Sequence, residues 1–166
     1  AAQILIDSLS NDAEVWLFTS YDVDGATSAA LLVRWFRAMG KELPIYIPDR
    51  LTEGYGPSPA AFRRMAEQGA DLVVTLDGGA AAYDAIAAAG EMGLEVVVID
   101  HHEVGVALPP AVAIVNPNRQ DDLSGLGYLA AVGVAFVTIV AVNRLLRQRG
   151  WYAAGRPEPD LLRWLD

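Results

Sequence analysis

Short runs of β-branched and other apolar residues alternate with helix-length segments along this chain, and this alternation constrains its fold most. The runs at 15–19, 72–76 and 96–99 are typical of buried strands. Strands separated by helices are joined in parallel, so we predict an α/β protein with a mostly parallel sheet and helices on both faces. In such sheets ligands bind beyond the carboxyl ends of the strands, which makes the strand ends the first place to look for a site.

Apolar spacing and helix start and stop signals predict the remaining elements. Further strands are expected at 44–47 and 112–115, and helices at 4–9, 26–39, 59–68, 80–89 and 129–146. Ser58 is the expected N-cap of the third helix, with Pro59 at its first position. The segment 149–159 is expected to be a connector, followed by another helix or strand from Asp160.

Length and composition narrow the class of protein. The 166 residues, 53% of them hydrophobic, suffice for one domain with a sizeable core. The net charge of −9 disfavours nucleic-acid binding through a broad basic surface, although carboxylates that hold a metal also count in this total. The absence of cysteine excludes disulfides and fits a cytoplasmic protein. No secretory signal or membrane span is expected, since Arg34 and Arg37 interrupt the best apolar candidate.

Acidic residues follow two of the predicted strands. Asp22 and Asp24 share one tight turn before Gly25, where a hard divalent cation could take oxygen from both carboxylates. Asp77 follows the strand at 72–76 and precedes two glycines. Each aspartate taken alone is also compatible with a helix cap or a turn, so the weight of the pattern lies in their shared sheet edge.

The third strand end carries Asp100, His101 and His102, and these are the only two histidines in the chain. Adjacent residues on an extended segment point in opposite directions, so we expect one histidine to bind metal and the other to face a phosphate. Two satisfied surface histidines are the alternative. Two loops are expected near the same edge, at 48–56 and 116–119, and either could be a plain surface loop.

Taken together, these segments resemble the DHH phosphoesterase superfamily, and within it most closely the RecJ single-strand DNA exonucleases. The resemblance rests on the segments 22–30, 47–56, 98–103, 116–119 and 131–136, which occur in the family's order. It implies a Rossmann-like DHH domain over 1–166 and hydrolysis of single-stranded DNA from 5′ to 3′ in repair and recombination.

The resemblance also implies a role for each candidate residue. Two Mn²⁺ or Mg²⁺ ions would be held by the metal ligands Asp22, Asp24, Asp77 and His101. Among the catalytic residues, His102 would contact the phosphate or aid proton transfer, and Asp100 would orient a neighbour. The candidate substrate contacts are Arg50, Tyr55 and Arg119.

The chain departs from the family pattern in ways that predict impaired activity. Ser20 stands where RecJ enzymes usually carry another aspartate, and Phe18 stands where related pyrophosphatases keep a histidine. The last metal-ligand motif and a DHHA1-type domain are expected to lie beyond residue 166. Two other functions remain open: a phosphodiesterase for short oligonucleotides, cyclic dinucleotides or pyrophosphate, and a non-catalytic scaffold with partners of its own.

Overall fold

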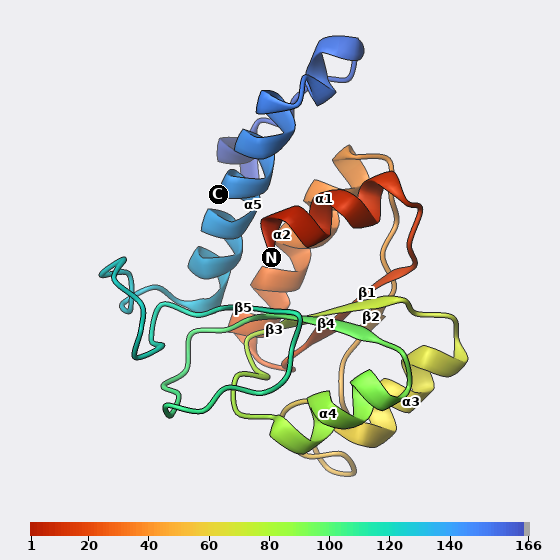
Figure 1. Ribbon diagram of the computed structural model, residues 1–166, viewed down its shortest axis with the longest axis vertical. Helices are drawn as coiled ribbons and strands as arrows, with labels where there is room; N and C mark the ends of the chain where they lie inside the picture. The colour runs from red at the N-terminus through yellow and green to blue at the C-terminus, as the bar shows by residue number, and fades with distance from the viewer. Residues whose placement is uncertain (165–166) are drawn as a thin grey trace.

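The computed structural model describes residues 1–164, which form a five-stranded parallel sheet with the strand order β2-β1-β3-β4-β5 (Figure 1). The strands are β1 (Val15–Thr19), β2 (Ile45–Tyr46), β3 (Leu72–Leu76), β4 (Glu95–Ile99) and β5 (Ala113–Val115). The helices are α1 (Ala2–Ser10), α2 (Val23–Ala38), α3 (Pro59–Glu67), α4 (Tyr83–Glu91) and α5 (Ala131–Gln148). Two short 3-10 helices, η1 (Trp151–Ala154) and η2 (Leu161–Trp164), follow α5. The predicted fold class is confirmed.

Helices cover both faces of the sheet. Helices α1, α2 and α5 pack on one face, and α3 and α4 pack on the other (Figure 1). Along β3, Val74 faces the first layer and Val73 the second, and both side chains are fully buried. Each such side chain contributes about 1.5–3 kcal/mol by leaving water. A strand buried on both faces must be apolar throughout, which explains why these runs stand out in the sequence.

The strand order has a switch point between β1 and β3. From β1 the chain passes outward to β2, and then crosses back to β3 on the other side of β1. The connections before and after this point therefore diverge, and such a switch point opens a binding crevice at the carboxyl ends of the strands. β1 leads into Asp22 and Asp24, β3 into Asp77, and β4 into Asp100. All three acidic segments therefore lie at one edge of the sheet.

Helix boundaries differ from the predicted ones at the two helices nearest this edge. α2 begins at Val23, because Asp22 is itself the N-cap and accepts a hydrogen bond from the Gly25 amide. α4 begins at Tyr83 rather than at Ala80, because a tertiary hydrogen bond holds the Ala80 amide outside the helix. The helix expected at 59–68 has the predicted Ser58 cap.

α5 is long and apolar enough to meet the length and composition of a membrane span, a segment that the sequence expectation did not single out. Its 18 residues have a mean hydropathy of 1.3, and 44% of them are buried within the fold. The apolar character has a local cause, since α5 packs against α1 and α2 in the core. Trp35 of α2 donates a hydrogen bond of 2.8 Å to Asn143 of α5 inside this contact.

Candidate metal and active site

Asp77 lies at the centre of the site in a strained conformation. Its φ is +56°, which is uncommon for a residue with a side chain, and its side chain is only 2% exposed. Its Oδ2 has no hydrogen-bond partner among residues 1–164. Leaving a buried carboxylate oxygen unpaired costs free energy, so this oxygen is available to a ligand.

Gly79 makes the turn after Asp77 possible. Its φ is +109°, and a Cβ there would lie 2.6 Å from the Thr75 hydroxyl oxygen. No side chain fits such a contact unless the Thr75 side chain moves. The glycine therefore holds the turn closely against β3 and keeps Asp77 at the end of the sheet.

Asp22 lies near enough to Asp77 for each carboxyl group to shift the pKa of the other. Burial, reinforced by the charge of Asp22, raises the pKa of Asp77 to about 6. The hydrogen bond from the Gly25 amide, 3.0 Å long, instead lowers the pKa of Asp22. Two neighbouring carboxyl groups that cannot both ionise freely are a site that a divalent cation would stabilise.

His101, which follows β4, approaches the carboxylates of Asp77 and Asp24. Its Nε2 is 3.2 Å from Asp77 Oδ1 and 3.8 Å from Asp24 Oδ2. Its Nδ1 is 3.2 Å from the Leu129 carbonyl oxygen, which can only accept, so Nδ1 carries the proton. Nε2 thus faces the carboxylates of Asp77 and Asp24, as in metal-binding histidines whose other nitrogen is held by a carbonyl.

Asp100 organises the backbone after β4. Its buried carboxylate accepts hydrogen bonds from the His101 amide (2.7 Å), the His102 amide (3.2 Å) and the Ala80 amide (3.0 Å). It also binds His102 Nδ1 at 2.7 Å. Burial alone would lower the pKa of His102, but the hydrogen bond and charge of Asp100 outweigh it and raise that pKa.

The two histidine rings lie side by side, so the expectation that they point in opposite directions is wrong. Their centroids are 4.7 Å apart, and one donor atom from each of Asp77, His101 and His102 lies within 4.8 Å of the others. The strand ends at Ile99, before both histidines, and the Asp100 carboxylate turns His102 back toward the cluster.

Two asparagines that the sequence reasoning missed hold the histidine backbone. Buried Asn116 donates 2.9 Å to the His102 carbonyl and accepts 2.8 Å from the Asn118 amide. Asn118 donates 2.5 Å to the His101 carbonyl and 3.2 Å to the Gly127 carbonyl. The segment 116–119 could have indicated these asparagines, but the sequence reasoning considered only its arginine as a candidate.

Of the predicted substrate contacts, Tyr55 lies at the cluster. Its hydroxyl donates 3.1 Å to the Asp77 carbonyl and lies 3.3 Å from His102 Nε2. Burial raises the Tyr55 pKa, so the hydroxyl stays protonated. Tyr21, also missed by the sequence reasoning, meets Tyr55 edge-on at 6.3 Å, and the Arg50 guanidinium lies 5.6 Å from the Tyr21 ring.

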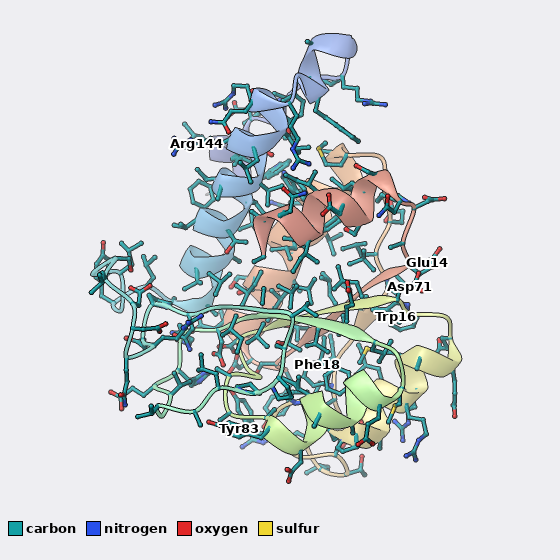
Figure 2. All side chains as sticks on the ribbon, viewed as in Figure 1. Glu14, Trp16, Phe18, Asp71, Tyr83 and Arg144 are labelled. Carbon is teal, nitrogen blue, oxygen red and sulfur yellow. The ribbon has the colours of Figure 1, made fainter. Side chains whose placement is uncertain are left out.

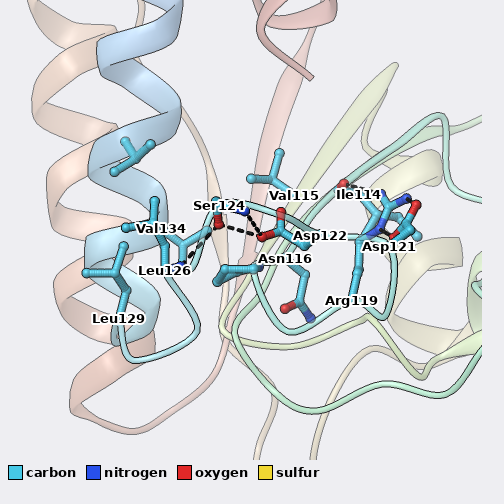
Figure 3. Close-up of a pocket in the computed structure, with 12 residues that line it drawn as sticks. Ile114, Val115, Asn116, Arg119, Asp121, Asp122, Ser124, Leu126, Leu129 and Val134 are labelled. Atoms are coloured by element: carbon cyan, nitrogen blue, oxygen red, sulfur yellow. Dashed lines mark hydrogen bonds and ion pairs between the residues drawn. The ribbon is translucent and has the colours of Figure 1, made fainter.

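Arg119 is held elsewhere. Its guanidinium makes two hydrogen bonds to Asp121, of 2.9 and 2.6 Å, and a third of 2.9 Å to the Ile114 carbonyl (Figure 3). It lines a separate cavity of about 320 Å³ between β5 and the start of α5. A role in substrate binding stays a prediction for this residue.

The two positions that depart from the family pattern are both buried. Ser20 is 4% exposed, and its hydroxyl lies near Asp22 without a hydrogen bond of normal geometry to any described residue. Gly25 packs directly on it, since a Cβ on Gly25 would lie 2.4 Å from the Ser20 carbonyl oxygen. Phe18 is a core residue that stacks on Tyr46, between the sheet and the α3 and α4 layer (Figure 2). Neither residue supplies a metal ligand of the kind expected in the family.

Comparison with known proteins places this geometry in a family. The model of the DHH family, N-terminal domain, matches residues 14–160. The single-stranded-DNA-specific exonuclease RecJ of Dickeya dadantii is 40% identical over 168 residues, covering 100% of this chain and 29% of the relative. RecJ of Escherichia coli is 37% identical over 92% of this chain and 26% of the relative.

Solved structures agree. A crystal structure of exonuclease RecJ bound to manganese is 33% identical, with a TM-score of 0.79 over 95% of this chain and 38% of that one. RecJ in complex with Mn²⁺ from Thermus thermophilus is 29% identical, with a TM-score of 0.74 over 95% of this chain and 21% of that one. The chain thus spans less than a third of the length of the curated relatives described above. By the family match and the shared fold, this chain belongs to the DHH family.

Proposed function

We propose that this chain is the catalytic domain of a metal-dependent exonuclease that hydrolyses single-stranded DNA from its 5′ end. The observation that carries the proposal is the convergence of Asp77, His101 and His102 at one sheet edge, with a buried carboxylate oxygen left unpaired among the described residues. The similar RecJ proteins bear the name single-stranded-DNA-specific exonuclease. Residues 1–166 would form a single DHH domain of a longer cytoplasmic protein that acts in repair and recombination.

The donor set fits Mn²⁺ or Mg²⁺. Carboxylate oxygens and one imidazole nitrogen are ligands that Mn²⁺ accepts, and Mg²⁺ takes the carboxylates. In this proposal Asp22, Asp24, Asp77 and His101 hold two such ions. When bound, the ions would polarise a phosphoryl oxygen and lower the pKa of water. The negative surface would otherwise repel a phosphodiester, so metal occupancy would also reverse the local charge.

The residues of the chain would position the substrate and move its protons. His102 is half exposed, and the Asp100 carboxylate favours its protonated form, so it can donate a hydrogen bond or a proton to a phosphate oxygen. Asp100 itself is buried and satisfied, and therefore acts as the positioning group of His102. Tyr55 and Arg50 would contact the strand beside the cluster, whereas Arg119 would first have to leave Asp121.

The test is Mn²⁺-dependent release of nucleotides from 5′-labelled single-stranded DNA, compared with 3′-labelled and duplex DNA. We expect release from the 5′ label, loss of it in Asp77→Asn and His101→Ala, and no loss in the control Asp84→Asn, which is exposed on α4. Ser20→Asp, introduced into the chain or into a longer form, is expected to raise the rate. Absence of release in a longer Ser20→Asp form would contradict the proposal.

Two further measurements separate the two alternatives. Faster turnover of a dinucleotide than of a long strand would favour a small-nucleotide phosphodiesterase. Calorimetry with Mn²⁺ that shows no uptake dependent on Asp77 and His101 would favour a scaffold.

A further inference from the structure

Ser20 follows β1 directly, at the end of the sheet that carries the candidate metal ligands, but its side chain carries no charge. The residue is 4% exposed, and its hydroxyl oxygen has no hydrogen-bond partner of normal geometry among the described residues. The pKa of the Asp22 carboxyl group is lowered chiefly by the Gly25 amide, with smaller lowering contributions from Asp77 and Ser20, so these side chains lie close together. Asp77 Oδ2 is likewise buried and unpaired in the described structure. Two unpartnered oxygens beside the Asp22 carboxylate indicate a second position for a cation, on the Asp22 side of Asp77.

The position beside His101 is the better equipped of the two. His101 Nε2 lies 3.2 Å from Asp77 Oδ1 and 3.8 Å from Asp24 Oδ2, so an ion there would meet two carboxylates and an imidazole nitrogen. The ring is already oriented, because its Nδ1 is held by the Leu129 carbonyl. The described part of the chain holds one group of three mutually close carboxylate and imidazole donor atoms, and it includes Asp77 and His101 but not Asp22.

The position beside Asp22 has less charge to offer a cation. Its donors are the Asp22 carboxylate, the Asp77 carboxylate that both positions share, and the neutral Ser20 hydroxyl. Asp22 Oδ1 also caps α2 by accepting a hydrogen bond of 3.0 Å from the Gly25 amide. An ion beside His101 would neutralise most of the Asp77 charge. A second ion would then meet one free carboxylate and the repulsion of the first ion.

We propose that this site binds its two metal ions with very unequal affinity, tightly beside His101 and weakly beside Asp22, because Ser20 supplies only a hydroxyl to the second position. The inference rests on the proposed function and concerns how this particular chain fills the site. The number of charged ligands sets the affinity of a protein site for a hard cation. At low Mn²⁺ the chain would therefore carry one ion, and the two-ion state would form only at higher Mn²⁺, which makes the proposed activity sensitive to metal concentration.

The test combines titration calorimetry with electron paramagnetic resonance, and Mn²⁺ alone is the probe. We expect one tight equivalent and a second equivalent whose dissociation constant is about 100-fold larger or more. At one equivalent the resonance spectrum should show the sharp hyperfine lines of an isolated Mn²⁺ ion. The broad signal of two coupled ions should appear only when the second equivalent binds.

Ser20→Asp supplies the decisive variant. The added carboxylate should tighten the second equivalent about 10-fold or more and leave the first unchanged. Ser10→Asp adds the same charge at the exposed end of α1 and is the matched control. Asp22→Asn keeps a side-chain oxygen that can cap α2, so it should remove the second equivalent and preserve the first.

Four outcomes would overturn the inference. These are two equivalents of similar affinity in the natural chain, a coupled signal at one equivalent, a second equivalent that is unchanged in folded Ser20→Asp, and loss of the first equivalent in Asp22→Asn. Each of them leaves the proposed function intact, because that function needs Mn²⁺ uptake that depends on Asp77 and His101. Absence of any such uptake would contradict the proposed function and this inference together.

Discussion

The side-chain amide of Asn118 donates a 2.5 Å hydrogen bond to the backbone carbonyl of His101, 17 residues before it in the chain. The same amide group also reaches the Gly127 carbonyl, so it links the histidine to the loop that leads into α5. Asn116 makes the equivalent contact to His102. The orientation of both rings thus depends on a loop that follows a different strand.

Asn118→Asp should therefore weaken metal binding while preserving side-chain shape. Aspartate cannot donate to the two carbonyls, and its charge is repelled by them. Outer groups that orient a metal-binding histidine typically change affinity by about 10-fold or more. Titration calorimetry with Mn²⁺ measures the effect, and Asn11→Asp, exposed at the end of α1, controls for the added charge. Equal Mn²⁺ affinity in both variants would show that the asparagine does not position His101.

Asp77 should make the metal-free protein less stable as pH rises. Its pKa lies near 6 in the folded protein, against an ordinary value of 3.8, so the folded state holds a proton more tightly than the unfolded state. The contribution to stability is present below about pH 4 and lost as pH rises through 6. His102, whose pKa is also raised, acts in the same direction at higher pH.

Asp77→Asn should flatten this pH dependence and raise the free energy of unfolding of the metal-free protein at pH 7. A gain of about 1 kcal/mol or more is expected from removing a buried, poorly satisfied charge. Added Mn²⁺ should stabilise the natural chain and leave this variant almost unchanged. Urea unfolding at pH 4 and pH 7 tests both statements. If the free energy of unfolding changed between pH 4 and pH 7 by the same amount in the natural chain and in the variant, the assignment to Asp77 would be contradicted.

Asp100→Asn should destabilise the fold as well as the site. An amide at this position can accept on one side only, so its NH₂ group would face the Ala80 amide or the donors of the histidine segment. A buried mismatch of this kind costs about 1–3 kcal/mol. Chemical denaturation measures the cost, and the His102 ring resonances should show a lower pKa once the Asp100 charge is gone. Asp121→Asn, an exposed carboxylate, should show neither change.

Gly79→Ala should destabilise the fold by more than about 1 kcal/mol, as expected where φ is positive and the new methyl has no room. The Thr75 hydroxyl supplies the steric part of this cost at 2.6 Å. Gly90→Ala is the matched control, because Gly90 is helical and its new methyl would meet no described atom within 4 Å apart from its chain neighbours and the backbone of its own helix. That control should be neutral or stabilising. Thermal unfolding of the two single variants and of Gly79→Ala with Thr75→Ala would separate backbone strain from the clash.

The sheet and its functional edge were predictable because a strand buried on both faces must be apolar along its whole length. The Ser58 cap was predictable for a similar reason, since its partner lies three residues away. The start of α4 was not, because the residue that holds Ala80 is 20 positions distant. The direction of His102 depends on that same residue, Asp100. The hydrogen bonds from the two asparagines to the histidine carbonyls span 14 and 17 residues. Arg119 could have been judged better, since Asp121 follows it by two positions.

The candidate ligands follow three different strands, with two helices and two strands between Asp22 and Asp77 and a further helix and strand before His101. No contiguous peptide from this chain can bring them together. The cluster forms only after β1 has paired with β3 and β3 with β4, which are long-range contacts that form slowly. Tight metal uptake would therefore report completed folding of the sheet, and a folding intermediate that lacks one of these strand pairs would have no such affinity.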